Sequence, residues 1–84
     1  MVKIVWAKHV LELLDELPLR DADLIVEKTK PLGRFPRMYP VRPKGRFRRH
    51  RWLLAGRWIV YYRVADETVY LRAPWPAQIP LGTR

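Results

Sequence analysis

The residues best suited to chemistry lie between positions 34 and 63. This segment contains ten lysines or arginines and no acidic residue, and it supplies the excess in a formal net charge of +9 over 84 residues. An exposed protein face normally mixes both signs, because dense like charges repel one another. The segment therefore predicts a polyanionic partner, for which nucleic acid is the usual candidate. The alternative is a basic surface without function, balanced by acidic residues elsewhere in the fold.

The residue types that are missing narrow the chemistry further. The chain has no cysteine and no serine, which excludes disulfides, thiolate zinc sites and thiol or serine nucleophiles. The two histidines, His9 and His50, belong to different expected elements, and most acidic residues fall on the expected helices. The four glycines are too dispersed to form a phosphate-binding loop. We therefore expect neither a metal nor a cofactor.

The hydrophobic periodicity predicts which elements must position these side chains. A period of two indicates strands, a period near 3.6 indicates helices, and proline and glycine mark the breaks. Pro18 separates two helical stretches, which we expect to form an antiparallel hairpin. The expected elements are a strand at residues 2–6, helices at 7–17 and about 19–30, a proline-rich loop at 31–45, and strands at 46–54, 57–64 and 68–73.

This order predicts an α+β fold of the type β-α-α-β-β-β in one domain that spans residues 1–84. Short turns join the last three strands, so the simplest architecture is a twisted antiparallel sheet with the helical hairpin packed on one face. Within the hairpin, the apolar stripes comprise Val10, Leu13, Leu14 and Leu17 in the first helix and Ala22, Ile25 and Val26 in the second. We expect Pro74, Pro76 and Pro80 to end regular structure, with a loosely ordered tail from about residue 76.

Side chains alternate between the two faces of each strand. Residues 46–54 allow two registers one residue apart, and the preferred register places His50 and Trp52, rather than Arg51 and Leu53, on the face away from the helices. The side chains expected in the core are Trp58, Val60, Tyr62, Val64, Val69, Leu71 and Ala73. Those expected on the open face are Arg48, His50, Arg57, Tyr61, Arg63, Tyr70 and Arg72.

Cations interleaved with aromatic rings suit a nucleic-acid backbone and its bases. On this basis the candidate RNA-binding residues are Lys44, Arg46, Arg48, Arg49, Arg51, Trp52, Arg57 and Tyr70. The alternative reading is structural, because tryptophan and tyrosine on strands commonly serve packing and a single histidine is commonly a surface residue.

The chain resembles the RelE/ParE toxins of bacterial toxin–antitoxin systems over residues 2 to about 80. The segments that carry the resemblance are IVW near the start, LELLDELP, PLGRFPRMYP and RHRWLLAGRWIVYYRVADETVYLRAPW. The resemblance implies a small basic toxin that a cognate antitoxin neutralises. RelE-like members cut mRNA in the ribosomal A site, whereas ParE-like members poison DNA gyrase without cutting nucleic acid themselves.

The chain departs from the family pattern at two places. His50 and Trp52 fall on or near the basic strand positions of the family, but Ile59 stands where the next strand often carries a catalytic arginine. The C-terminal signature, usually a histidine or arginine followed by further basic residues, reads PWPAQ from Pro74 to Gln78. The C-terminal arginine or histidine and the tyrosine of the family pattern are missing, so the resemblance assigns no catalytic role to these positions.

The cations and the histidine suggest substitutes for these roles. Metal-free RNA cleavage requires a base for the 2′-hydroxyl, an acid for the leaving 5′-oxygen, and cations for the charged phosphorane. The candidate catalytic residues are His50 and Tyr61 for proton transfer and Arg63 and Arg72, flanked by Arg57, for the phosphate. We prefer a metal-independent, ribosome-dependent mRNA endonuclease; a gyrase inhibitor, a non-toxic member that binds only RNA or antitoxin, and a generic RNA-binding module stay open.

The chain contains no apolar run of about 20 residues that would span a membrane. Its first residues also lack the continuous apolar stretch of a secretion signal. We therefore expect a cytoplasmic protein whose partners are the antitoxin, the ribosome and mRNA, or gyrase in the alternative.

Overall fold

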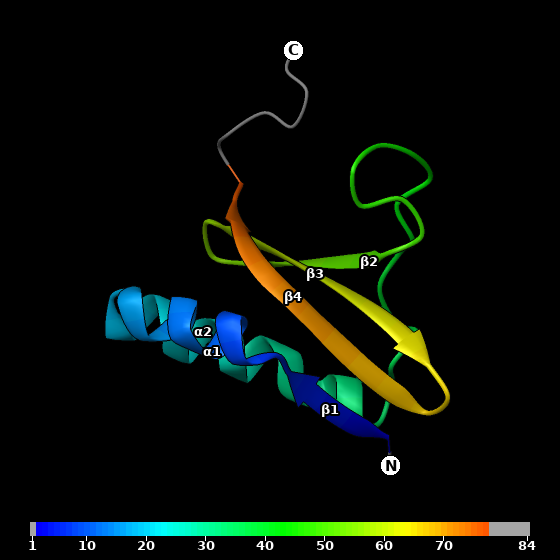
Figure 1. Cartoon of the computed structure of the whole chain (residues 1–84), viewed down its shortest axis with the longest axis horizontal. Coiled ribbons are helices and arrows are strands. Elements are labelled where there is room, and N and C mark those ends of the chain that lie inside the picture. The colour runs from blue at the N-terminus through cyan, green and yellow to red at the C-terminus, as the bar shows by residue number, and fades with distance from the viewer. Residues whose placement is uncertain (1, 78–84) are drawn as a thin grey trace.

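The order of elements confirms the expected strand, two helices and three strands. The computed structural model describes residues 2–77 and leaves the side chain of Ala73 undescribed. The elements are β1 (Lys3–Trp6), α1 (Lys8–Glu16), α2 (Leu19–Thr29), a 3-10 helix η1 (Lys30–Gly33), β2 (Arg51–Ala55), β3 (Trp58–Ala65) and β4 (Thr68–Pro76). Figure 1 shows both helices on one side of the sheet, and the long loop before β2 rises beyond it. The protein is thus a small α+β domain.

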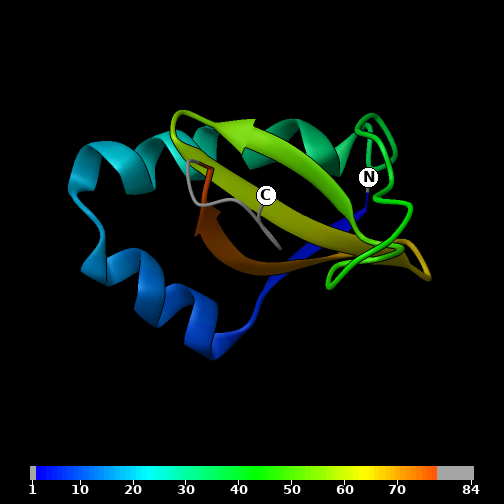
Figure 2. The same ribbon diagram turned by 90° about the horizontal axis from the view of Figure 1, so that it is seen from above.

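The sheet is mixed, which corrects the expected antiparallel arrangement. Its strand order is β1-β4-β3-β2. The pairs β2–β3 and β3–β4 are antiparallel, as their short turns require, but β1 runs parallel to β4. A tight turn fixes the direction of the next strand, whereas the two helices between β1 and the hairpins leave the direction of β1 free. Figure 2 shows α2 alongside β2 and α1 near β4.

The helices bury the apolar residues that the sequence predicts for their inner faces, with two exceptions. Val10 and Leu14 of α1 and Ile25 of α2 lie in the core. Leu13 and Val26, which were expected on the inner face, are each 37% exposed, because the buried stripe of each helix is narrower than the apolar stripe. Leu17 and Pro18 form the break between the helices, and Pro18 caps the start of α2. No helix in residues 2–77 is long and apolar enough to cross a membrane.

The helix-facing side of the sheet carries the expected core residues. Val60, Tyr62, Val69 and Leu71 are fully or almost fully buried, and Leu53 joins them from β2. Trp58 and Val64 are partly buried against the same cluster. The expected faces of β3 and β4 are therefore confirmed for these residues, and the opposite face holds the side chains of chemical interest.

The prolines near the end of β4 do not end the strand, contrary to expectation. Pro74 pairs with Val60 and Pro76 with Trp58 in the β3–β4 ladder. β1 pairs with β4 only as far as Leu71, so within residues 2–77 the last part of β4 is an edge, where a proline is tolerated. Pro80 and most of the expected loose tail lie outside the described residues.

The turn between β3 and β4 stores conformational strain. Asp66 and Glu67 have φ values of 49° and 58°, in the left-handed region. They form a two-residue connection between the paired residues Ala65 and Thr68. Such hairpin turns favour Asn-Gly or Asp-Gly, because a side chain in this region is disfavoured by about 1–2 kcal/mol.

We expect Glu67→Gly to stabilise the protein by about 1 kcal/mol, because glycine adopts a positive φ without steric strain. The free energy of unfolding, measured by urea denaturation, checks this expectation. Glu67→Gln is the matched control, since it removes the same charge and keeps the side chain. Equal stability of the two variants would show that the turn is not strained.

Candidate nucleic-acid interface

A closed loop carries the densest group of cations. We call residues 42–50 the basic loop. The Arg42 N–H donates to the His50 carbonyl at 2.7 Å, and the Arg49 N–H donates to the Arg42 carbonyl at 2.9 Å. Beyond this neck Val41 forms an isolated bridge with Arg51, the first residue of β2. The loop is thus fixed at its base and projects beside the sheet (Figure 1).

The basic loop replaces the first part of a strand expected at residues 46–54. Gly45 and Arg49 have φ values of 94° and 72°, which a regular strand excludes. Residues 46–49 are turns, and β2 begins only at Arg51. Four of the candidate RNA-binding side chains are therefore exposed on a loop rather than on a strand: Lys44, Arg46, Arg48 and Arg49.

The preferred register of β2 is confirmed from Trp52 onward. Trp52 pairs with Tyr61, and Leu53 pairs with Val60. Leu53 is 1% exposed and lies in the core, so Trp52 lies on the open face with Tyr61. His50 precedes the strand and reaches the same open face through its contact with Arg72.

His50 and Arg72 lie side by side although they are 22 residues apart. The Arg72 Nε–H donates to His50 Nε2 at 3.3 Å. The other ring nitrogen, Nδ1, lies 3.3 Å from the Arg48 carbonyl oxygen. A carbonyl only accepts and a guanidinium only donates, so Nδ1 carries the proton and Nε2 holds the lone pair. His50 is therefore neutral, with its basic nitrogen directed at an arginine.

The surroundings of His50 favour this neutral form. Burial lowers the pKa of His50 below its usual 6.5, and the positive charges of Arg72 and Arg63 lower it further. The hydrogen bond to the Arg48 carbonyl partly opposes this shift. Arg63 and Arg72 are exposed, and Arg63 pairs across strands with Tyr70, which is 43% exposed. Four candidate residues thus share one part of the open face.

We expect the stability of the protein to fall as the pH drops from about 7.5 to about 5.5. In this range the unfolded chain takes up a proton at His50 near pH 6.5, whereas the folded protein resists protonation to a lower pH. The unfolded state therefore binds more protons, and acidification favours it. Urea denaturation of the wild type and His50→Gln checks this, since the comparison cancels the other titrating groups. Identical pH dependence of the two proteins would contradict it.

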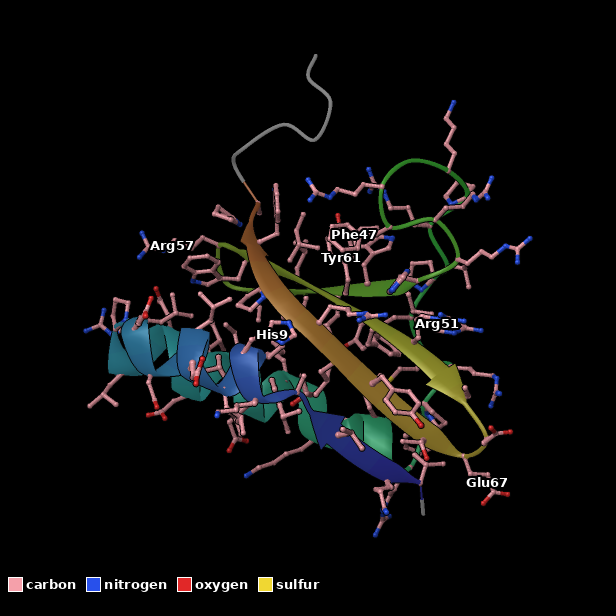
Figure 3. The ribbon with its side chains drawn as sticks, in the orientation of Figure 1. His9, Phe47, Arg51, Arg57, Tyr61 and Glu67 are labelled. Carbon is pink, nitrogen blue, oxygen red and sulfur yellow. The ribbon has the colours of Figure 1, made fainter. Side chains whose placement is uncertain are left out.

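Tyr61 is on the open face, as expected, but it is not exposed. Its relative exposure is 0%, because the Phe47 ring of the basic loop stacks on it with centroids 4.0 Å apart and planes 14° apart. Figure 3 shows the two labelled rings together above the sheet. Burial raises the pKa of Tyr61, and the charge of Arg42 only partly offsets this. The phenol is therefore not placed to take or give a proton in this arrangement.

Phe47, Arg42 and Trp75 belong to this surface but were not among the site residues predicted from the sequence, whereas Arg46 was. Phe47 covers Tyr61 and also meets the rings of His50 and Trp75 edge-on, at 5.7 and 6.2 Å. Arg42 lies over the Tyr61 ring at 5.9 Å, and Arg46 over the Trp75 ring at 5.5 Å. An isolated phenylalanine within the cationic stretch RFRR was the available signal, since nothing in that stretch buries it locally.

Arg51 and Arg57 lie apart from this surface, so the structure does not bring them together with the other predicted RNA-binding residues. Arg51 pairs with Tyr62, and its Nη1 donates to the carbonyls of Arg37 and Tyr39 at 3.3 and 2.7 Å. It therefore ties the loop before β2 to the sheet. Figure 3 shows Arg57 near the β2–β3 turn, to the left of the labelled Phe47–Tyr61 stack.

Arg57 instead joins the β2–β3 turn to α2. Its Nη2 donates to the Asp21 carboxylate at 2.9 Å. The Trp58 indole and then Arg57 hold the pKa of Asp21 below its usual range. The pair lies at a helix start where a carboxylate is favoured. Arg57 therefore links the β2–β3 turn to the helical hairpin through an ion pair, although its side chain is 59% exposed.

Within residues 2–77, no three histidine, aspartate or glutamate side chains lie close enough together to hold a metal ion. The interface therefore consists of arginines, one neutral histidine and stacked aromatic rings. No family model matches the chain, and no curated protein matches it.

Proposed function

We propose that the chain is an RNA-cleaving toxin of the RelE type, which binds mRNA through the open face of its sheet and the basic loop. The contact of His50 Nε2 with Arg72, beside Arg63, carries this proposal. It combines an unprotonated nitrogen with two guanidinium groups. The order of elements and the resemblance of the sequence to RelE/ParE toxins support the same assignment.

The proposed reaction divides the work between the histidine and the two arginines. A phosphate drawn to Arg72 and Arg63 competes for the guanidinium that now meets His50, which frees Nε2. Nε2 then takes the proton of the 2′-hydroxyl, and the 2′-oxygen forms a bond to the adjacent phosphorus as the bond to the 5′-oxygen breaks. Water protonates the leaving 5′-oxygen. The products are a 2′,3′-cyclic phosphate and a 5′-hydroxyl end.

We propose an antitoxin with an acidic arm as the partner. An acidic arm on the basic loop and the open face would occupy the sites of the phosphates. The helical hairpin offers such a partner a second, mainly apolar surface. This groove is lined by Leu11, Leu14, Leu17, Leu19, Ala22 and Val26 together with the acidic residues Asp15 and Asp23, so an apolar segment of the partner rather than its acidic arm would fit there. Leu19 is 80% exposed and Leu11 48% exposed, so the groove presents apolar surface to solvent.

A reconstituted translation reaction tests the proposed activity. The purified protein is added to ribosomes engaged on a defined mRNA, and the fragments are analysed for their ends. We expect new fragments with 2′,3′-cyclic phosphate and 5′-hydroxyl ends that form without added divalent ions beyond those the ribosome needs. Intact mRNA under these conditions would contradict the assignment as a nuclease.

The cover over Tyr61 favours a second candidate, a ParE-like gyrase inhibitor. Tyr61 is buried, and Arg57 is paired with Asp21. Of the predicted catalytic residues, His50, Arg63 and Arg72 are then the ones left to contact RNA. A protein that only binds would need none of them. Purified gyrase with DNA separates the two candidates, since an inhibitor of this kind accumulates trapped cleavage complexes and leaves mRNA intact.

A further inference from the structure

The cover over Tyr61 consists of one side chain from a loop. Tyr61 belongs to the central strand β3 but lies on the face away from the helices. Phe47 reaches it from the tip of the basic loop, whose neck is fixed by the hydrogen bonds of Arg42. Phe47 itself is only partly buried. The stack therefore closes a surface that β3 and β4 would otherwise present to solvent.

The closed arrangement leaves polar groups without partners. The Tyr61 hydroxyl, the Trp75 Nε1–H and Arg42 Nε are buried, and none of them has a hydrogen-bond partner. All three belong to Tyr61 itself or to residues in contact with the Phe47–Tyr61 stack. The other two such groups in the described residues, the Trp58 Nε1–H and the Tyr62 hydroxyl, belong to residues on the helix-facing side of the sheet. Buried polar groups in native proteins are nearly always satisfied, and each exception needs an explanation. A phenylalanine in this position cannot satisfy any of them.

A nucleobase in the place of the Phe47 ring could form hydrogen bonds with the polar groups that phenylalanine leaves unpaired. Its flat face can stack on Tyr61, as bases do on aromatic side chains of single-strand binding proteins. Its edge carries acceptors and donors for the Trp75 N–H, the Tyr61 hydroxyl and Arg42. The flanking cations of the basic loop, Arg46 and Arg48, are exposed and can meet the phosphates on either side of that base.

The backbone on either side of Phe47 adopts positive φ values. Arg49 holds a φ of 72°, a conformation that non-glycine residues adopt at a cost, and Gly45 holds a φ of 94°. These two residues flank Phe47. A segment with strained backbone and few buried contacts opens more easily than the strands beneath it.

We propose that Tyr61 and Trp75 form a binding subsite for an unpaired RNA base, and that Phe47 occupies this subsite in the unbound protein. The base displaces Phe47 when the basic loop engages the neighbouring phosphates. This inference rests on the RNA binding of the proposed function and adds to it the place where a base is held and the residue that competes for that place.

Two short RNAs of equal charge test the proposal. One is an eight-nucleotide single strand with all its bases, and the other lacks the central four bases but keeps every phosphate. Binding to the wild type and to Phe47→Ala is measured by fluorescence anisotropy. We expect the wild type to bind the complete RNA at least about 5-fold more tightly than the abasic RNA, because stacking favours the base.

The variants decide whether Phe47 competes with the base. Phe47→Ala is expected to bind the complete RNA about 3- to 10-fold more tightly than the wild type and the abasic RNA equally well. Tyr61→Phe keeps the stacking surface and should lose a few-fold of affinity for the complete RNA alone. Phe47→Leu retains an apolar contact with the sheet, so it preserves the test if Phe47→Ala is unfolded by circular dichroism, and it should show the same direction of change.

The outcomes separate this inference from the proposed function. Equal, salt-sensitive binding of both RNAs by the wild type would overturn the base subsite and leave RNA binding standing. A loss of affinity for the complete RNA in folded Phe47→Ala and Phe47→Leu would show that Phe47 is itself the stacking surface, and would overturn its role as competitor. Failure of the wild type to bind either RNA at low salt would contradict the proposed function and this inference together.

Discussion

Arg72→Ala is expected to cut mRNA about 10²- to 10³-fold more slowly than the wild type. The Arg72 guanidinium meets His50 at 3.3 Å in the free protein and is the cation best placed to stabilise charge that develops on the phosphate. Removing a preorganised donor of this kind affects the transition state more than the bound substrate. Binding of a short single-stranded RNA should therefore weaken only a few-fold, in line with the loss of one phosphate contact.

The matched control for this prediction is Arg20→Ala. Arg20 is exposed on α2, on the helical side of the sheet, and its substitution by alanine removes the same charge. We expect its cleavage rate to stay within about 2-fold of the wild type, since a distant exposed charge is screened. Equal loss of cleavage in the two variants would show that net charge, and not the contact with His50, determines the rate.

The triple variant Lys44→Gln/Arg46→Gln/Arg48→Gln is expected to bind single-stranded RNA about 10²-fold more weakly at low salt. The three cations are exposed on the basic loop and face no acidic residue in the hydrogen bonds and ion pairs of the described chain. Each phosphate contact to a single strand adds about 0.7 to the dependence of log affinity on log salt. The slope should therefore decrease by about 2.

A charge-matched variant separates local contacts from net charge. Lys3→Gln/Lys8→Gln/Arg20→Gln removes three exposed cations from β1, α1 and α2. We expect a much smaller loss of affinity and an almost unchanged salt slope, because these side chains lie away from the basic loop. Equal slopes for the two triple variants would contradict the assignment of the loop as the phosphate-binding part of the surface.

The helices and hairpins could be predicted because local signals determine them. The stripe with Val10 and Leu14 predicts α1, Pro18 separates the helices, and Asp66-Glu67 marks the last turn. The parallel pairing of β1 with β4 had no local signal, since it depends on where the helical hairpin returns the chain. The extension of β4 through Pro74 and Pro76 also depended on tertiary context, namely the end of β1 pairing at Leu71.

The candidate site was predicted in part for the same reason. Strand alternation and the register at Trp52 correctly predicted that His50, Arg63 and Arg72 lie on one face. This held even though His50 and Arg72 are 22 residues apart in the sequence. The pairing of Arg57 with Asp21 could not be foreseen, because it depends on how the β2–β3 turn packs on α2.

The conformation of the basic loop could likewise not be predicted from the sequence. Alternation predicted a strand from residue 46, but Gly45 and Arg49 adopt positive φ values that turn the chain and bring Phe47 over Tyr61. A contact between a loop residue and a strand residue leaves no periodic signal in the sequence.

The most direct measurement of the central claim is the mapping of mRNA 5′ ends after induced expression in bacteria without any antitoxin. The wild type is compared with Arg72→Ala and Arg20→Ala at equal protein levels. We predict growth arrest with new 5′ ends inside translated frames for the wild type and Arg20→Ala, and neither effect for Arg72→Ala. Growth arrest with intact mRNA, or cleavage by Arg72→Ala at the level of the wild type, would contradict the account.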